Sequence, residues 1–277
     1  MQEKSLPVLK LQHIEHVIKD ESNVSWRDEH LRILEIGCGD GKFLNSISEI
    51  NPTAKLYGCD IKAMSYKPKF NFKIIKKNQP LPYKSKSFDV VIIMDVLEHI
   101  KDYMFMIKEV KRVMKTAAWF VGFVPCEGQL ISAYTFYKMI FGKDLFKRTK
   151  DHVNQFKRRE LIDLFQSNFN GGEFYYSYHL LGQWMDATLF TLMLNKKIAK
   201  KFWNENKYYN EDTNKKSMFN RLLTLANMIA YKESLFMMNR KMFSAGLHFA
   251  VRNYEYAHMY DEICYPFYGH QDRWING

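Results

Sequence analysis

The sequence has few cysteines, no long hydrophobic run and no apolar leader. Its four cysteines, Cys38, Cys59, Cys126 and Cys264, form no CxxC pair, so neither a zinc knuckle nor a disulfide framework is expected, and buried thiols in a reducing compartment are favoured. Every apolar stretch is shorter than the about 18 residues that a membrane-spanning helix needs. The first ten residues, MQEKSLPVLK, lack the apolar core of a signal peptide. We therefore expect a cytoplasmic protein without a spanning helix.

The composition suits a folded protein with a basic surface. The 277 residues are 47% hydrophobic and 16% aromatic, which is enough for a packed core and allows one large or two small domains. The formal net charge is +11, yet residues 1–125 hold 20 basic and 15 acidic groups and residues 126–277 hold 21 and 15. Lysine outnumbers arginine 31 to 10, whereas recognition of phosphates and bases favours arginine. A solvated basic surface is therefore favoured over a nucleic-acid partner.

Short apolar segments alternate with amphipathic ones between residues 31 and 125. The expected strands are residues 31–37, 55–61, 72–77, 88–96 and 117–124, and the expected helices are residues 42–50 and 101–115. The run FDVVIIMDV at 88–96 is apolar almost throughout, as in a central strand covered on both faces. Because parallel neighbours need crossover connections, this alternation predicts an α/β fold with a doubly wound, mostly parallel sheet.

After Pro125 the pattern becomes mainly helical. The expected elements are helices at 129–141 and 158–169, strands at 173–179 and 243–253, and an all-helical segment at 184–241 with a polar break near 204–216. The expected organisation is a core of residues 1–183 and 242–256, a helical insertion or cap at 184–241, and an aromatic tail at 257–277.

A glycine-rich turn follows the first expected strand. It reads E-I-G-C-G-D-G, with Glu35 before Gly37, Gly39 and Gly41. Glycines in a strand-to-helix turn let the backbone approach a ligand closely. Nineteen residues after Gly41 the second expected strand ends in Asp60, a carboxylate that can accept hydrogen bonds from both hydroxyls of a ribose. The spacing differs from the G-x-G-x-x-G of dinucleotide sites, so we expect another adenosine-bearing cofactor. The alternative is a sheet that binds a different nucleotide or none.

Three segments carry a family resemblance. They are residues 35–41, residues 58–61 (GCDI) and residues 81–100 (LPYKSKSFDVVIIMDVLEHI). In this order they resemble the class I S-adenosylmethionine-dependent methyltransferases, in particular the type 11-like group that methylates small molecules. The HVNQF segment at 152–156 is similar to the segment before that group's last crossover helix. The resemblance implies a Rossmann-like, seven-stranded sheet whose last strand, antiparallel at 243–253, follows the helical insertion.

The resemblance also implies a site for S-adenosyl-L-methionine, with S-adenosyl-L-homocysteine as product. Glu35 would orient the methionine end, Asp60 would hold the ribose and Ile61 would pack on the adenine. Where the family often has an acid after the third strand, this chain has Asn78 and Gln79, whose amide oxygens can accept the same hydrogen bond. The whole set implied to bind the cofactor is Glu35, Gly37, Cys38, Gly39, Gly41, Asp60, Ile61, Asn78, Gln79 and Asp95. The segment after Asp60 is short, so a single helical turn is expected there.

The methyl acceptor is expected after the fourth strand, where Asp95, Glu98 and His99 stand. Methyl transfer is an in-line displacement that mainly needs alignment, with a base only where the acceptor must lose a proton. His99 is the best candidate base by residue type, because the ordinary pKa of a histidine is about 6.5. Asp95, Glu98 and His99 are thus the candidate catalytic residues. The alternative is that Glu98 and His99 brace the start of the next helix.

Asp95, Glu98 and His99 also form, with His152, a set of metal-ligand types. The pattern resembles the acid-x-x-Glu-His cluster of ubiquinone-biosynthesis O-methyltransferases and of small-RNA 2′-O-methyltransferases, which carry Glu where this chain has Asp95. A divalent cation there would lower the pKa of an acceptor hydroxyl. Because the aspartate side chain reaches less far, no metal is expected, and a divalent cation is kept as the alternative.

These observations predict methylation of a small-molecule or lipid-linked acceptor, with oxygen as the methylated atom. Residues 143–159 carry seven basic residues against Asp144 and Asp151 around His152, which favours an anionic acceptor. Residues 184–202 combine apolar side chains with lysines, so peripheral membrane contact is an alternative to packing within a helical cap. RNA methylation is a second alternative, although no N-P-P-Y motif follows the fourth strand, and a scaffold without turnover is a third. The oligomeric state stays open.

Overall fold

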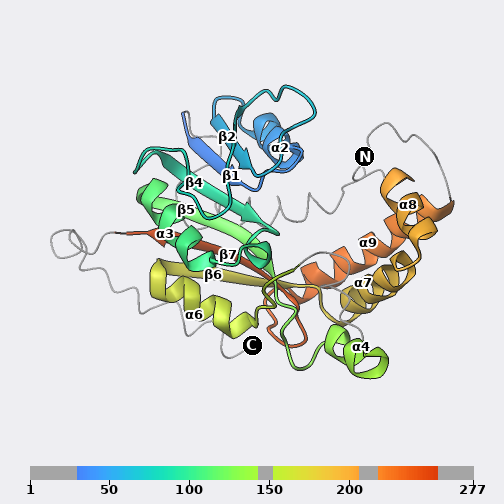
Figure 1. Cartoon of the computed structure of the whole chain (residues 1–277). Coiled ribbons are helices and arrows are strands. Elements are labelled where there is room, and N and C mark those ends of the chain that lie inside the picture. The colour runs from blue at the N-terminus through green and yellow to red at the C-terminus, as the bar shows by residue number, and fades with distance from the viewer. Residues whose placement is uncertain (1–29, 143–151, 206–217, 255–277) are drawn as a thin grey trace.

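The strands form one mixed sheet in the computed structural model, which describes residues 30–142, 152–205 and 218–254. Within these residues, seven strands follow the order β3-β2-β1-β4-β5-β7-β6 (Figure 1). They are β1 (Arg32–Ile36), β2 (Lys55–Asp60), β3 (Asn71–Ile74), β4 (Phe88–Met94), β5 (Met114–Pro125), β6 (Asn170–Ser177) and β7 (Gly246–Asn253). Neighbours from β3 to β5 pair in parallel, whereas β7 is antiparallel to both β5 and β6. The predicted fold class is confirmed.

Helices cover both faces of this sheet (Figure 1). On one face lies α2 (Lys42–Ile50), whose buried Leu44 packs in a cluster with Ile33 of β1. On the other face, α3 (Tyr103–Val113) and α6 (Arg158–Asn168) share a second buried cluster with β4, β5 and β7. Burial of such apolar surface contributes about 25 cal/mol per Å² and is the main term that stabilises the fold.

The strand β4 shows why an almost unbroken apolar run is needed at the centre of the sheet. Its Val90 and Ile92 belong to the cluster beneath α2, and its Val91 and Ile93 belong to the cluster beneath α3 and α6. All four side chains are fully buried. Because successive side chains of a strand point to opposite faces, the middle of a strand covered on both faces favours apolar residues, and the one acid of β4, Asp89, stands near its start, where it pairs with Lys115.

The connection between β2 and β3 differs from the expectation. Residues 61–70 contain bends but no helix, although a single helical turn is expected there from the sequence. Pro68 disfavours helical backbone in the residue before it. The buried Phe70 then packs close to Gly41 and Gly58, where its ring fills the space that side chains would otherwise occupy. This connection therefore closes over the sheet as an irregular loop.

Four more helices stand beside the sheet, on the right of Figure 1: α4 (Ala133–Phe141), α7 (Leu180–Met193), α8 (Lys196–Glu205) and α9 (Met218–Met237). The helix α7 contacts each of the other three. Gln183 of α7 ties them to the core, because its Oε1 accepts from the Ala133 amide at 2.8 Å and its Nε2 donates to the carbonyls of Tyr178 and Phe243 at 2.8 and 2.5 Å. In the described parts of the chain, no helix is long and apolar enough to cross a membrane.

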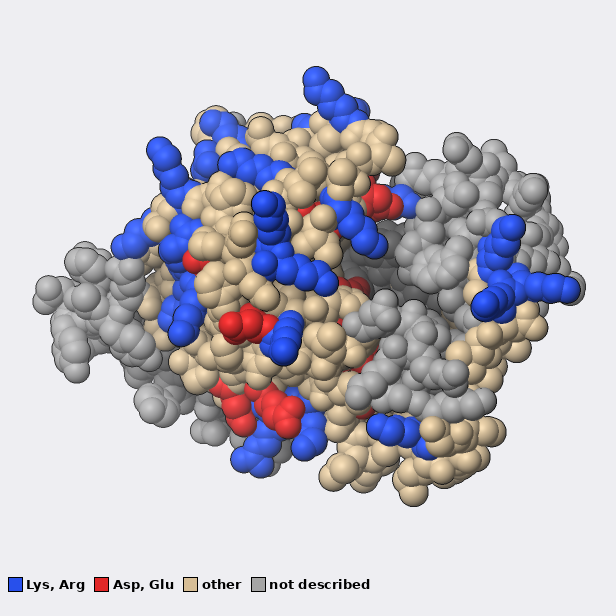
Figure 2. Space-filling view, in the orientation of Figure 1, with Lys and Arg blue, Asp and Glu red and all other residues tan. Residues whose placement is uncertain are grey.

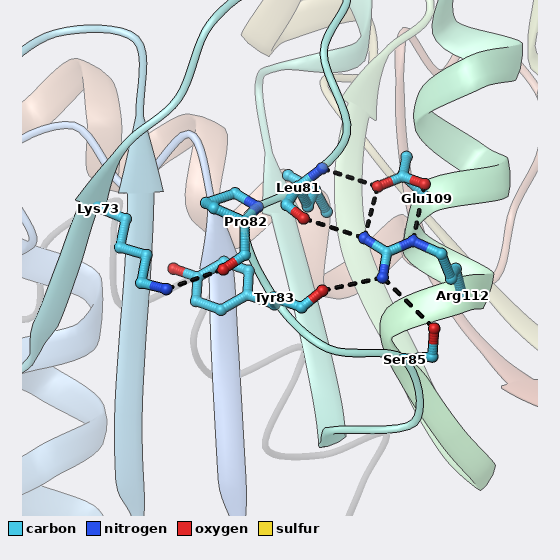
Figure 3. Close-up of polar contacts among 7 residues, drawn as sticks. All are labelled: Lys73, Leu81, Pro82, Tyr83, Ser85, Glu109 and Arg112. Carbon is cyan, nitrogen blue, oxygen red and sulfur yellow. Dashed lines mark hydrogen bonds and ion pairs between the residues drawn. The ribbon is translucent and has the colours of Figure 1, made fainter.

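An ion pair on α3 fixes the loop between β3 and β4 (Figure 3). Arg112 Nε and Nη2 donate to the Glu109 carboxylate at 2.8 and 2.7 Å. Arg112 also donates to the carbonyls of Leu81 and Tyr83 at 3.0 and 2.8 Å, while Glu109 accepts from the Leu81 amide at 2.7 Å. Such charge-assisted hydrogen bonds are stronger than neutral ones. The loop that carries Asn78 and Gln79 is thereby anchored on its far side.

Candidate active site

The glycine turn between β1 and α2 has backbone geometry that favours glycine. The φ angles of Gly37, Gly39 and Gly41 are +74°, +53° and +72°, in the left-handed region. A Cβ on Gly37 would come 2.3 Å from a methyl carbon of Val96, and one on Gly41 would come 2.5 Å from the ring of Phe70. A Cβ on Gly39 would have no neighbour within 4 Å. Two of the glycines are therefore needed for internal packing, and the third borders open space.

Asp60, at the end of β2, faces this turn. Its Oδ2 accepts from the Gly39 amide at 2.9 Å, and its Oδ1 accepts from the Lys62 amide at 2.9 Å. The parallel pairing of β1 with β2 places the two strand ends side by side. The structure thus brings together the acid and the glycine turn, which are separate motifs in the sequence, as the resemblance implies. A carboxylate oxygen can accept more than one hydrogen bond, so Asp60 can bind the turn and two hydroxyls together.

Glu35 and Cys38 lie inside the protein beside the turn. Glu35 is a buried residue of β1 whose neighbours across the sheet are Gly58 and Ile92. Cys38 is buried as well, and burial raises the pKa of its thiol, as it raises the pKa of Cys59 to about 12. Both thiols are therefore protonated at neutral pH. Cys38 contributes backbone to the turn rather than a reactive sulfur.

Three residues expected around an adenine ring are exposed and follow the neighbouring strands β2 and β3. Ile61, directly after β2, exposes about half of its side chain. Asn78 and Gln79, after β3, are exposed too, and Asn78 has a left-handed φ of +58°. Because β2 and β3 are parallel neighbours, the ends of both strands lie at one edge of the sheet. The arrangement leaves these side chains accessible to a ligand.

Asp95 follows β4 in an unusual backbone conformation. Its φ is +51°, its side chain is exposed, and its amide donates to the Phe123 carbonyl of β5 at 3.2 Å. The next residue, Val96, packs against Gly37 of the glycine turn. Asp95 therefore directly precedes a residue that contacts the turn. A non-glycine residue in this region is uncommon, and such strain is frequent at functional sites.

Glu98, His99 and His152 form a compact group beyond β4. Glu98 and His99 belong to the short 3₁₀ helix η1 (Leu97–His99). Glu98 is buried, while the His99 side chain is 41% exposed with its Nε2 3.9 Å from Glu98 Oε1. The rings of His99 and His152 meet edge to face, with their centres 4.7 Å apart. The N-cap of α3 is Asp102, which accepts from the Phe105 amide at 3.0 Å, so neither Glu98 nor His99 caps that helix.

Glu127 is a member of this group that the sequence reasoning missed. Its carboxylate lies 2.8 Å from His152 Nδ1 through Oε1 and 2.9 Å through Oε2, and each of the two side chains is only 3% exposed. Glu127 stands just after Pro125 at the end of β5, the strand next to β4. Because adjacent parallel strands end at the same edge of a sheet, an acid after the fifth strand was the available signal.

The segment from His152 to Phe156 is fastened to η1. The amides of Val153 and Asn154 both donate to the Glu98 carbonyl, at 2.9 and 3.0 Å. Asn154 Nδ2 donates to the carbonyls of Leu97 and Ile100 at 3.1 and 2.7 Å. This explains why an HVNQF sequence stands here: the asparagine holds the loop, and the loop holds His152 against His99.

The group also has the chemistry of a metal site. Among the described residues, Glu98, His99 and His152 offer ligand atoms that lie within 4.8 Å of one another. Asp95 is outside this set, so three of the four residues named from the sequence come together. The Glu127 carboxylate on His152 is the kind of partner that orients a metal-binding histidine. The same arrangement suits either proton transfer or a divalent cation.

Comparisons with known proteins identify the family of this chain. A family model described as a methyltransferase domain matches residues 12–170, which is more than half of the chain. Among the curated relatives, a demethylmenaquinone methyltransferase of Oceanobacillus iheyensis is 29% identical over 170 residues, or 52% of this chain and 71% of the relative. A ubiquinone biosynthesis O-methyltransferase of Pelagibacter ubique is 26% identical over 155 residues, or 50% of this chain and 61% of the relative.

Solved structures share the fold at low sequence identity. The YcgJ protein of Bacillus subtilis superimposes with a TM-score of 0.51 and 15% identity, covering 89% of this chain and 98% of its own. A second structure is phosphoethanolamine N-methyltransferase 2 of Haemonchus contortus in complex with phosphomonomethylethanolamine and S-adenosylhomocysteine. It superimposes with a TM-score of 0.53 and 12% identity, covering 90% of this chain and 52% of its own. With the matched family model and the fold described above, the chain belongs to the methyltransferase domain family and is a class I S-adenosylmethionine-dependent methyltransferase.

Proposed function

We propose that this enzyme methylates a hydroxyl oxygen of a small or lipid-linked acceptor bound beyond β4 and β5. The observation that carries the proposal is the buried Glu127 and His152 pair beside Glu98 and His99. Such a group can remove a proton from a hydroxyl, which a neutral alcohol or phenol needs before it attacks as a strong nucleophile. One relative's name, an O-methyltransferase of ubiquinone biosynthesis, points the same way, whereas the name demethylmenaquinone methyltransferase points to a quinone acceptor without naming an oxygen.

The cofactor would lie across the glycine turn and the ends of β2 and β3. The open space over Gly39 fits a ligand, and Asp60 is placed to accept from ribose hydroxyls beside it. Bound S-adenosylmethionine supplies an electrophilic methyl group on a sulfonium. Glu35 would orient the amino acid end, Ile61 would pack on the adenine, and Asn78 or Gln79 would accept from its amino group. The complete proposed set is Glu35, Gly37, Cys38, Gly39, Gly41, Asp60, Ile61, Asn78, Gln79 and Asp95.

On the acceptor side, His99 is the proposed base. It is the histidine of the group with exposed surface, and Glu98 stands 3.9 Å from its Nε2. His99 would take the hydroxyl proton as the new oxygen–carbon bond forms and the sulfur–carbon bond breaks, with the electron pair of that bond staying on sulfur. Asp95, between the glycine turn and η1, would align the acceptor. An in-line reaction of this kind depends mainly on such positioning.

A divalent cation held by Glu98, His99 and His152 is the second mechanism that an observation favours, because their ligand atoms are within 4.8 Å of one another. The cation would lower the pKa of the acceptor hydroxyl, and His99 would then be a ligand in place of a base. The two mechanisms need the same residues. They differ in their requirement for metal.

The proposal predicts that His99→Asn lowers kcat on a phenolic acceptor by on the order of a hundredfold and leaves binding of S-adenosylhomocysteine unchanged. Methyl transfer from labelled S-adenosylmethionine to hydroxylated rings, with the matched amines in parallel, is the measurement. Full activity after treatment with a chelator supports the base, and activity restored only by added Mg²⁺ or Mn²⁺ supports the cation. Transfer to amines but to no hydroxyl would contradict O-methylation.

A further inference from the structure

Among the described residues, the buried side chains of α4 lie on one side of the helix. Ser132 caps its start, since Ser132 Oγ accepts from the Thr135 amide at 3.1 Å, and Gly142 ends it with a φ of +61°. Its Tyr134 and Tyr137 are buried in a small cluster that includes Ala187 of α7. These two tyrosines are therefore core residues of the helical unit.

The opposite side of α4 is apolar and faces solvent. The α4 surface comprises six large apolar side chains of α4 and of the loop just before it, each between 50% and 82% exposed: Leu130, Ile131, Phe136, Met139, Ile140 and Phe141. Phe136, Met139 and Ile140 follow the spacing of one helical face. Single exposed apolar side chains are ordinary, whereas a contiguous group marks an interaction site.

The α4 surface continues onto α7. The rings of Phe136 and Trp184 meet edge to face with their centres 5.9 Å apart, and Trp184 is also about half exposed. Tryptophan at the border of an apolar surface is typical of membrane interfaces, because its ring combines an apolar body with a polar N–H.

Basic side chains lie on and beside the α4 surface, and the acid Glu233 of α9 accepts from the amides of Leu181 and Gly182 at the start of α7. From residue 128 to residue 143 the sequence contains Lys138 and Lys143 and no acid, and Lys138 is exposed. The helix α8, which contacts α7, exposes Lys196, Lys197 and Lys200. Figure 2 shows the tan surface over α4 with basic side chains beside it and over α8. This combination of apolar and basic side chains complements anionic lipid headgroups above an apolar interior.

We propose that the α4 surface docks on the surface of an anionic lipid bilayer. A helix of nine residues is too short to span the bilayer, so α4 would lie in the plane of the headgroups with its apolar side inserted. A second copy of the chain is a poorer occupant, because a two-fold contact through α4 would bring the two Lys138 side chains near each other. Docking extends the proposed function, since it would place the site next to a lipid-linked acceptor, but it does not require that function.

Sedimentation of the full chain with vesicles tests the proposal. We expect binding to vesicles of phosphatidylcholine mixed with phosphatidylglycerol, and binding at least about fivefold weaker to phosphatidylcholine alone. The double variant Met139→Glu and Ile140→Glu should weaken binding by about tenfold or more, because it places acids on the inserted face. Ile74→Glu, an equally exposed apolar residue of β3, is the matched control and should bind as the unchanged chain does.

Two results would overturn the proposal. One is the absence of vesicle binding by a chain that still binds S-adenosylhomocysteine. The other is a dimer in analytical ultracentrifugation that the double variant abolishes while vesicle binding stays unchanged, which would assign the α4 surface to self-association. Vesicle binding by a chain that methylates no hydroxyl would uphold docking and refute the proposed function, so the two failures are distinguishable.

Discussion

Glu127 Oε1 lies 2.8 Å from His152 Nδ1, and only 3% of each side chain is exposed. Removing both groups from water is costly, and the hydrogen bond between them offsets that cost. The pair therefore holds the His152 ring in one orientation, edge to face with His99. Glu127 has no need to touch an acceptor, so we regard it as a positioning residue that acts through His152.

Replacing Glu127 by glutamine should separate positioning from folding, because the amide keeps the shape and removes the charge. We expect Glu127→Gln to lower kcat by on the order of tenfold to a hundredfold and to shift the pH profile of kcat, with little change in Kd for S-adenosylhomocysteine. Steady-state kinetics over a range of pH and calorimetry provide the two readouts. Glu173→Gln on β6 is the control. An unchanged kcat and pH profile would refute a positioning role.

The helix α3 also stabilises the loop between β3 and β4, because its Glu109 and Arg112 form hydrogen bonds with Leu81 of that loop (Figure 3). The hydrogen bonds from Arg112 keep the pKa of Glu109 below its ordinary value of 4.5, and the carboxylate in turn raises the pKa of Arg112. A carboxylate with a lowered folded-state pKa stabilises the protein above its unfolded-state pKa. That contribution is lost as pH falls through the folded-state value.

Glu109→Gln should therefore lower the free energy of unfolding by about 1–3 kcal/mol at neutral pH, because a charge-assisted pair is lost. The difference from the unchanged protein should shrink in acid, where Glu109 becomes protonated in both folded and unfolded chains. Urea unfolding at about pH 7 and about pH 3 measures it. Asp163→Asn removes an exposed ion pair with Arg159 and should have almost no effect. A difference that does not vary with pH would contradict this account.

Elements with strong periodicity were predictable from the sequence. The bounds of α2 agree with the expectation, and β4 was recognised from its almost unbroken apolar run, because burial on two faces leaves a clear pattern. The loop at 61–70 was predicted wrongly, because Pro68 disfavours helical backbone before it and Phe70 packs against the distant Gly41 and against Gly58. Glu127 was missed for a similar reason. Its pairing with His152 depends on β4 and β5 being neighbours in the sheet, and the local periodicity of a sequence does not reveal the order of strands.

Two groups of candidate functional residues lie at the same edge of the sheet. The glycine turn and Asp60 gather at the ends of β1 and β2, and the Glu98, His99 and His152 group gathers beyond β4. The helices α4, α7, α8 and α9 stand beside the sheet (Figure 1), and we propose that residues 184–241 form a cap on a core of residues 1–183 and 242–256. The tail proposed at 257–277 lies outside the described residues.

Basic side chains are spread over the surface of the molecule, as they are spread along the sequence. Figure 2 shows basic side chains scattered over the face drawn, without a single continuous stripe. Nucleic acid binding relies on a concentrated positive surface, so this face offers little support for an RNA substrate. The basic run at 143–159 falls partly outside the described residues and remains a proposed contact for an anionic acceptor.

Calorimetric titration with S-adenosylhomocysteine tests the central claim most directly, because the whole account depends on a cofactor lying against the glycine turn and Asp60. We predict that the unchanged chain binds one equivalent and that Asp60→Ala, still folded by circular dichroism, binds on the order of tenfold to a hundredfold more weakly through the loss of charge-assisted hydrogen bonds. No binding by the unchanged chain, or equal affinity of a folded Asp60→Ala variant, would contradict the proposed site.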